Sequence, residues 1–147
     1  MPFINIEPLP GEPIFVLHFE GQISSEDVKT AYQTTNAFWN DALRVTGWHI
    51  IIQLEKVEND FVDTINVLRA TGETETQFST VMPYITQYVV GTDAMSRLYS
   101  ESRRLPQFGG RLVAPFRRYE DALEAARQNV RSRLAADAST LTVDKGE

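Results

Sequence analysis

Two histidines, His18 and His49, are the first candidates for acid-base chemistry in this chain. Imidazole titrates closer to neutral pH than any other unperturbed side chain, so a general acid or base is looked for there first. Both residues fall inside apolar runs that predict β-strands, where a histidine is more often a hydrogen-bonded structural residue than a catalyst. We therefore expect that neither imidazole transfers a proton.

The sequence lacks the other common catalytic and metal-binding patterns. It has no cysteine, which excludes thiol nucleophiles and thiolate metal sites, and no Gly-x-Ser-x-Gly, His-Glu-x-x-His or phosphate-binding glycine loop. The carboxylates of Glu55, Glu58, Asp60 and Asp63 lie close together, but closeness in sequence does not provide the pair of carboxylates across a pocket that glycoside hydrolysis needs. We interpret this stretch as a solvated loop, and we expect a protein that is not an enzyme and holds no metal or cofactor.

One turn between a strand and a helix has the form of an anion site. Gly91, Thr92 and Asp93 follow an apolar run, and Arg97 comes one helical turn later. Free amides at the start of a helix can receive an anion, and an arginine would add charge. An ordinary capped helix is the simpler interpretation, because a single glycine is a weak signal.

An aromatic pair, Phe38 and Trp39, falls within the first helical pattern, whose apolar stripe extends from Val28 to Leu43. Adjacent residues cannot both point to the centre of one helical stripe. We therefore expect one of the two rings, with Trp39 as the candidate, to line a groove or a subunit interface.

The composition is that of one ordinary globular domain. The chain has 147 residues, of which 42% are hydrophobic and 23% charged. Its net charge of −6 argues against a general nucleic-acid binder, because phosphate neutralisation by Lys and Arg supplies most of that affinity. No apolar run approaches the ~20 residues of a membrane span, and no secretory signal is apparent, so we expect a cytoplasmic protein.

The pattern of apolar residues predicts an α/β fold with the element order β-β-α-β-α-β-α-β-α. Short apolar runs predict five strands, over residues 4–6, 14–19, 48–54, 88–90 and 111–114. Spacings of three and four predict helices that begin near Ser24, Asp60, Thr92 and Tyr119. The first should continue to Leu43, and the second should carry Phe61, Ile65, Leu68 and Gly72 on its inward face. The first two strands should form an antiparallel hairpin and the last three should be parallel, giving a mixed, mostly parallel sheet with packed helices. Residues 137–147 are unpatterned, so we expect one domain over residues 1–136 and a disordered tail.

The element order and the end of the chain resemble the STAS/SpoIIAA-like domains, a group named after sulfate transporters and anti-sigma-factor antagonists. The resemblance rests on three segments: Tyr88-Val89-Val90-Gly91, Gly110-Arg111-Leu112-Val113-Ala114-Pro115-Phe116 and Tyr119-Glu120-Asp121-Ala122-Leu123. It extends from about Ile14 to Leu134.

The resemblance implies a regulatory switch in the helix after the central strand. In the antagonists, a phosphorylatable serine in an Asp-Ser-x-Gly motif begins this helix. The corresponding segment here is Asp63-Thr64-Ile65-Asn66, which keeps an acidic residue and a hydroxyl but lacks the glycine. Thr64 is therefore the candidate phosphoacceptor, and we expect its hydroxyl to be exposed in the first turn of the helix.

The sequence supports three hypotheses of function. The first is a non-enzymatic STAS-like regulatory module that binds an unknown protein, or a second copy of itself, through the acidic loop and the helix that begins at Phe61. The second is a binder of a nucleotide, a lipid or another apolar molecule, at the turn of Gly91 or in a groove near Trp39. The third, an enzyme, has the least support.

Overall fold

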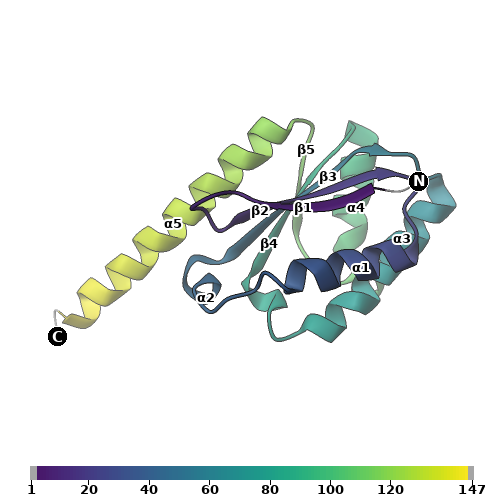
Figure 1. Cartoon of the computed structure of the whole chain (residues 1–147). Helices are drawn as coiled ribbons and strands as arrows, with labels where there is room; N and C mark the ends of the chain where they lie inside the picture. Colours follow the sequence, from purple (N-terminus) through teal and green to yellow (C-terminus); the bar gives the residue numbers. More distant parts are fainter. Residues whose placement is uncertain (1–2, 146–147) are drawn as a thin grey trace.

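The structure of the protein, a computed structural model, describes residues 3–145, and the surroundings of the side chains as far as residue 134 (Figure 1). Five strands form one sheet: β1 (Phe3–Pro8), β2 (Ile14–Gly21), β3 (Trp48–Val57), β4 (Ile85–Val90) and β5 (Val113–Phe116). The helices are α1 (Ser25–Asn36), α2 (Leu43–Thr46), α3 (Phe61–Glu75), α4 (Asp93–Arg103) and α5 (Tyr119–Lys145), with short 3₁₀ turns at Thr76–Phe78, Met82–Tyr84 and Pro106–Phe108.

The strands lie in the sheet in the order in which they occur in the chain, β1-β2-β3-β4-β5. Strands β1 and β2 form an antiparallel hairpin, while β2, β3, β4 and β5 are parallel to one another. This confirms the predicted mixed sheet and the predicted order of the main elements. The parallel strands are connected by helices, as parallel neighbours require.

Both faces of the sheet are covered. Helices α1, α3 and α4 pack on one face, whose core includes Leu17, Ile50 and Leu68, and α5 packs on the other (Figure 1). Because side chains alternate along a strand, β2 sends Phe15, Leu17 and Phe19 to the first face and Ile14 and Val16 to the second. The continuous apolar run of β3 has the same cause, since a strand buried on both faces needs apolar residues at every position.

Side-chain caps fix where three of the helices begin. Ser24 accepts the N–H of Asp27, and Asp27 in return accepts the N–H of Ser24, so the expected capping box is present. The side chain of Asp60 caps α3 by accepting the N–H of Asp63, and that of Thr92 caps α4 by accepting the N–H of Met95. The predicted helix starts are therefore confirmed.

Three boundaries differ from the expectation. The first helix ends at Asn36 instead of continuing to Leu43, after a run of threonines that favour extended conformations. Leu112 lies outside β5, which begins at Val113, and its side chain is 77% exposed. The last helix extends through most of the predicted tail, as far as Lys145, while residues 146–147 lie outside the described residues. Within residues 3–145, no helix combines the length and the apolar character that a bilayer crossing demands.

Candidate functional site

The carboxyl ends of the parallel strands lie at one edge of the molecule, on the right in Figure 1. There β2, β3 and β4 pass into the loops before α1, α3 and α4. Six of the candidate residues belong to this edge, on the starts of α3 and α4: Phe61, Asp63, Gly91, Thr92, Asp93 and Arg97. Open α/β sheets bind their ligands outside the carboxyl ends of the strands, so we call this region the carboxyl edge and take it as the candidate site.

The first turn of α3 exposes two large apolar side chains side by side. Phe61 is 66% exposed and Val62 is 65% exposed. Neither residue belongs to the two hydrophobic clusters that the described residues form. The buried side of α3 instead begins at Thr64, so the expectation that Phe61 shares the inward face with Leu68 is wrong. An exposed adjacent pair of this kind is typical of a contact surface, where single exposed apolar residues need no explanation.

The backbone under this pair is held in place by hydrogen bonds between the two loops of the edge. The side chain of Asn59 accepts the N–H of Ile23 at 2.7 Å and donates to the carbonyl of Ile23 at 2.9 Å. Gln22 donates to the carboxylate of Asp63 at 3.0 Å. The loop before α3 is thus tied to the loop before α1, which presents Phe61 and Val62 on a preorganised turn.

Acidic side chains surround the apolar pair. Glu58 and Asp60 are exposed and Asp63 is half-buried. None of the three forms an ion pair with a lysine or arginine among the described side chains. Asp60 and Asp63 lie at the start of α3, where the helix dipole favours negative charge. The first turn of α3 therefore presents an apolar centre with an acidic rim.

Thr64 does not occupy the exposed position expected of a phosphoacceptor. Its side chain is buried, and its hydroxyl donates to the carbonyl of Asp60 at 2.8 Å. Thr64 lies on the same side of α3 as the fully buried Leu68, one turn further along, whereas Phe61 and Val62 in the first turn are exposed. A kinase would have to open the first turn of α3 to reach this hydroxyl, so the structure argues against a switch at Thr64.

The turn after β4 uses much of its hydrogen-bonding capacity within the protein. The N–H of Gly91 donates to the carbonyl of Phe116 at 3.1 Å, and Thr92 accepts the N–H of Met95. Asp93 forms an exposed ion pair with Arg117 at 3.3 Å. The amide of Gly91 is therefore not free to receive an anion, and a carboxylate already stands beside the start of α4.

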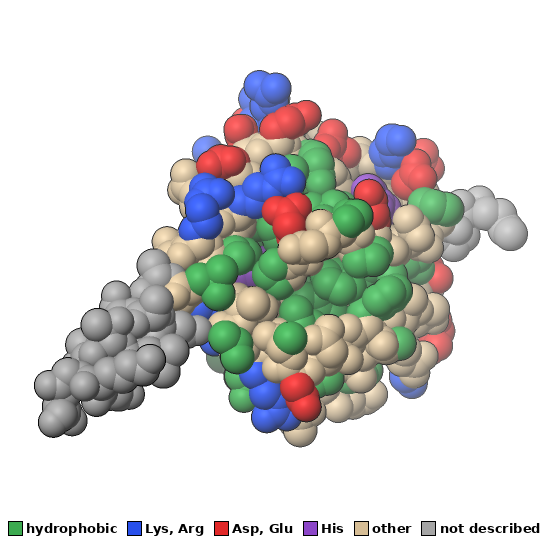
Figure 2. Space-filling model, turned by 60° about the vertical axis from the view of Figure 1, so that its left-hand side comes forward, with side chains coloured by type: hydrophobic (Ala, Val, Ile, Leu, Met, Phe, Trp, Pro, Cys, Tyr) green, Lys and Arg blue, Asp and Glu red, His purple; other side chains and the backbone are tan. Residues whose placement is uncertain are grey.

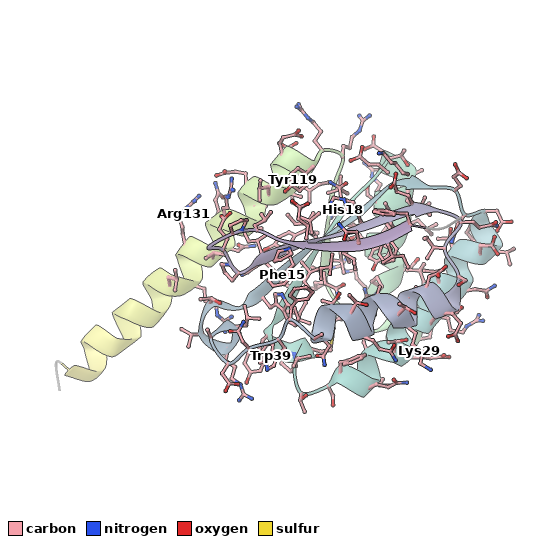
Figure 3. The ribbon with its side chains drawn as sticks, viewed as in Figure 1. Phe15, His18, Lys29, Trp39, Tyr119 and Arg131 are labelled. Carbon is pink, nitrogen blue, oxygen red and sulfur yellow. The ribbon has the colours of Figure 1, made fainter. Side chains whose placement is uncertain are left out.

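Trp39 lies at the opposite end of the molecule, apart from the carboxyl edge (Figure 3). Because α1 ends at Asn36, both members of the aromatic pair lie outside the helix, and each contacts one aromatic ring of the core. Trp39 packs on Trp48 with ring centroids 5.7 Å apart, and Phe38 meets Phe15 edge to face at 5.5 Å. Figure 2, turned so that this end comes forward, shows hydrophobic side chains gathered in the middle of the face. Phe38 is 40% exposed and Trp39 is half-buried, and the groove or interface expected at Trp39 stays a prediction.

The two histidines do not converge. Both point to the α5 face of the sheet, but His18 pairs in register with Gln53 and His49 with Ile14, four positions apart along the strands. The ring of His18 lies 3.1 Å from the carboxylate of Glu7, whereas His49 is buried and its Nδ1 lies 2.8 Å from the hydroxyl of Tyr88. Burial lowers the pKa of His49. Among the described residues, no group of three His, Asp or Glu side chains could hold a metal ion.

A buried polar cluster is the feature that sequence reasoning missed. Arg103 is fully buried and forms an ion pair with Glu75, and it also donates to Gln87 and to the hydroxyl of Tyr99. Tyr32 donates its hydroxyl to the same carboxylate. Burial, and after it the charge of Glu75, raises the pKa of Tyr32, so this hydroxyl stays protonated and continues to donate.

The backbone next to this cluster has no room for a side chain. Gly109 has φ +110°, and a Cβ atom there would lie 2.8 Å from the carboxylate of Glu75. The carbonyl of Phe108 accepts from Arg103 Nε at 2.8 Å. Glu75 and Arg103 are 28 positions apart in the sequence, and no motif links two residues at that separation. The ion pair could therefore not be predicted from the sequence. The cluster fixes the α1, α3 and α4 layer to the sheet and is not part of the carboxyl edge.

The architecture is a SpoIIAA-like α/β fold, as the resemblance of its sequence implied. Solved structures that share this fold include the following two. One is an uncharacterised protein of the DUF3478 family from Shewanella loihica, described as having a SpoIIAA-like fold, with a TM-score of 0.53, 10% identity, and coverage of 85% of this chain and 93% of that one.

The second is an anti-sigma factor antagonist from Mycobacterium paratuberculosis. It has a TM-score of 0.52 and 18% identity, and the match covers 86% of this chain and 95% of that one. No protein-family model and no curated protein matches the sequence. At these identities the two structures establish the fold.

Proposed function

We propose that this protein is a regulatory module that acts by binding another protein and performs no catalysis of its own. The binding face is the first turn of α3 at the carboxyl edge. The observation that carries the proposal is the adjacent exposed pair Phe61 and Val62, held on a rigid turn and set inside an acidic rim. The fold shared with an anti-sigma factor antagonist is consistent with this role.

The chemistry of the face defines the partner that would fit it. An apolar pocket would take up the ring of Phe61 and the side chain of Val62, and lysine or arginine residues around that pocket would meet Glu58, Asp60 and Asp63. A second copy of this chain would bring two acidic rims together across a symmetric interface, which like charges oppose. The proposed partner is therefore a different protein with a basic surface.

The test compares two variants that each remove one exposed apolar side chain. Phe61→Ser alters the proposed face, and Leu112→Ser is the matched control, since Leu112 is 77% exposed but lies before β5. A protein that is captured by the wild type and by Leu112→Ser, but lost with Phe61→Ser, would be purified and its affinity measured by calorimetry.

We expect Phe61→Ser to weaken binding of that purified partner about 30-fold or more, the effect of losing a central aromatic anchor. We also expect association to slow as salt is added, because the acidic rim steers the partner through charges that salt screens. Equal affinities of the wild type and Phe61→Ser would show that the proposed face is wrong. If salt does not change the affinity, the proposal that the partner has a basic surface is wrong.

A further inference from the structure

A cavity of about 70 Å³ lies inside the domain, between the sheet and the layer of α1 and α3. Strands β2, β3 and β4 form its floor, and α1, α3 and α4 contribute its roof. Its lining is almost entirely apolar and includes Leu17, Val28, Ile50, Ile52 and Leu68. About 10–15 Å³ of such space holds one water-sized group, so the cavity has room for roughly five to seven of them.

Two buried polar atoms of the lining have no hydrogen-bond partner among the described side chains and backbone. They are Trp48 Nε1 and Asn36 Oδ1. Trp48 is fully buried, so solvent does not reach its indole N–H. Leaving a buried donor unpaired is costly, and native structures satisfy most such groups with protein, water or a ligand.

The two unpaired atoms belong to residues that both contact Trp39. The backbone N–H of Trp39 donates to the backbone carbonyl of Asn36 at 3.1 Å, and the ring of Trp39 packs against that of Trp48. One atom is a donor and the other an acceptor. A single group that both accepts and donates a hydrogen bond would satisfy both, and a hydroxyl is the smallest such group in an organic molecule.

The other polar groups of the lining exclude a charged ligand. Tyr32, Gln87 and Tyr99 line the cavity as members of the buried cluster, where the positive charge of Arg103 is already matched by Glu75. A carboxylate or phosphate would therefore enter an apolar space without a free counter-charge, which is strongly unfavourable. The ligand must be neutral.

We propose that this cavity is a binding site for a small neutral alcohol. The hydroxyl accepts the Trp48 indole N–H and donates to Asn36 Oδ1, and the aliphatic part lies between β3 and the helices α1 and α3. A four-carbon alcohol such as 1-butanol, with five non-hydrogen atoms, has the size that the cavity admits. Asn59 and Thr64 line the cavity next to the protein-binding face, but the exposed pair Phe61 and Val62 does not, and the proposal does not depend on that face.

The test follows the indole N–H signals of the isotope-labelled protein by NMR during titration with 1-butanol and, separately, with 1-chlorobutane. The chloride has a similar shape but cannot donate a hydrogen bond. The chain has two tryptophans, and the variant Trp39→Phe identifies the signal of Trp48. We expect 1-butanol to shift the Trp48 indole signal saturably.

The variant Trp48→Phe removes the N–H and keeps most of the apolar volume, while Trp39→Phe serves as the matched control that retains it. The quantity to compare is the ratio of the two affinities, 1-butanol over 1-chlorobutane. We expect this ratio to be roughly 3–10-fold higher in the wild type and in Trp39→Phe than in Trp48→Phe, the worth of one hydrogen bond. Amide spectra of each variant establish that it is folded.

The wild-type titration decides the proposal even if Trp48→Phe fails to fold. A Trp48 indole signal that 1-butanol does not move would overturn the alcohol site. A cross-peak between the Trp48 indole N–H and water that persists after 1-butanol is added would also overturn it, because a water molecule would then occupy the site. Neither result would touch the proposed protein-binding face, whose test uses Phe61 and a protein partner.

Discussion

Replacing Glu75 with glutamine should strongly destabilise the domain. Among the described residues, Glu75 supplies the only carboxylate that is a hydrogen-bond partner of the fully buried Arg103. In Glu75→Gln the guanidinium keeps neutral acceptors at Phe108, Gln87 and Tyr99 but loses the charge that balances its own. A buried charge without a counter-charge is the costly half of a broken ion pair.

The expected loss is about 3–5 kcal/mol in the free energy of unfolding. The lower end is the better guide, because three neutral acceptors at 2.8–3.2 Å still solvate the guanidinium. Domains of this kind have about 5–15 kcal/mol in total, so this one substitution removes at least a fifth of the stability. The pair Glu75→Gln with Arg103→Met should cost less than the sum of the two single changes, because the second change removes the unbalanced charge.

Urea unfolding followed by the fluorescence of the two tryptophans measures these differences at a fixed pH. Glu73→Gln is the matched control, two residues away on α3 with an exposed side chain, and it should change stability by no more than about 0.5 kcal/mol. Equal unfolding midpoints for Glu75→Gln and Glu73→Gln would refute the argument that the ion pair is essential. Additive losses in the double variant would refute the role of the unbalanced charge.

Three further substitutions test other parts of the fold. Ser24→Ala removes half of the capping box of α1 and should lower the free energy of unfolding by about 1 kcal/mol, measured in urea. Burial lowers the pKa of His49 from its ordinary 6.5, so the unfolded chain binds the proton first and the native protein loses stability as pH falls below that value. His49→Gln should flatten this part of the curve of stability against pH. An unchanged curve would contradict the role of His49. Gly72→Ala would place a Cβ atom 2.8 Å from the backbone nitrogen of Gly109, a clash that should outweigh the gain of about 1 kcal/mol in helix propensity. The melting temperature of Gly72→Ala should fall. A rise would mean that the segment around Gly109 moves to make room for the Cβ atom.

The alternation and spacing of apolar residues predicted most of the fold, because both report directly on burial. The apolar run of β3 and the turn residues of the first hairpin determine a two-sided sheet with one antiparallel edge. Helix starts were predictable for a similar reason, since capping by Ser24, Asp60 and Thr92 is a local interaction. The position of Leu112 was not, because an apolar residue just before a strand has the same sequence pattern as one inside it.

The candidate site was predictable only as far as its position along the chain. Connecting elements place the starts of α3 and α4 at one edge, so Phe61, Asp63 and Asp93 could be grouped from the sequence. Which side of the helix faces solvent depends on tertiary packing, and that reversed the expectations for Phe61 and Thr64. Arg103 looked like one more surface arginine, because only the folded chain brings it to Glu75.

The agreement between sequence order and spatial order in the sheet has a consequence for the chain during its synthesis. Each new strand finds its neighbour already made, so β1 to β4 can assemble as the ribosome delivers them. The face that carries Ile14, Val16, Ile51 and Tyr88 is different, since its covering helix α5 follows all five strands. A nascent chain must therefore leave that apolar face open until α5 has been synthesised, which makes it the natural place for a chaperone to hold the unfinished domain.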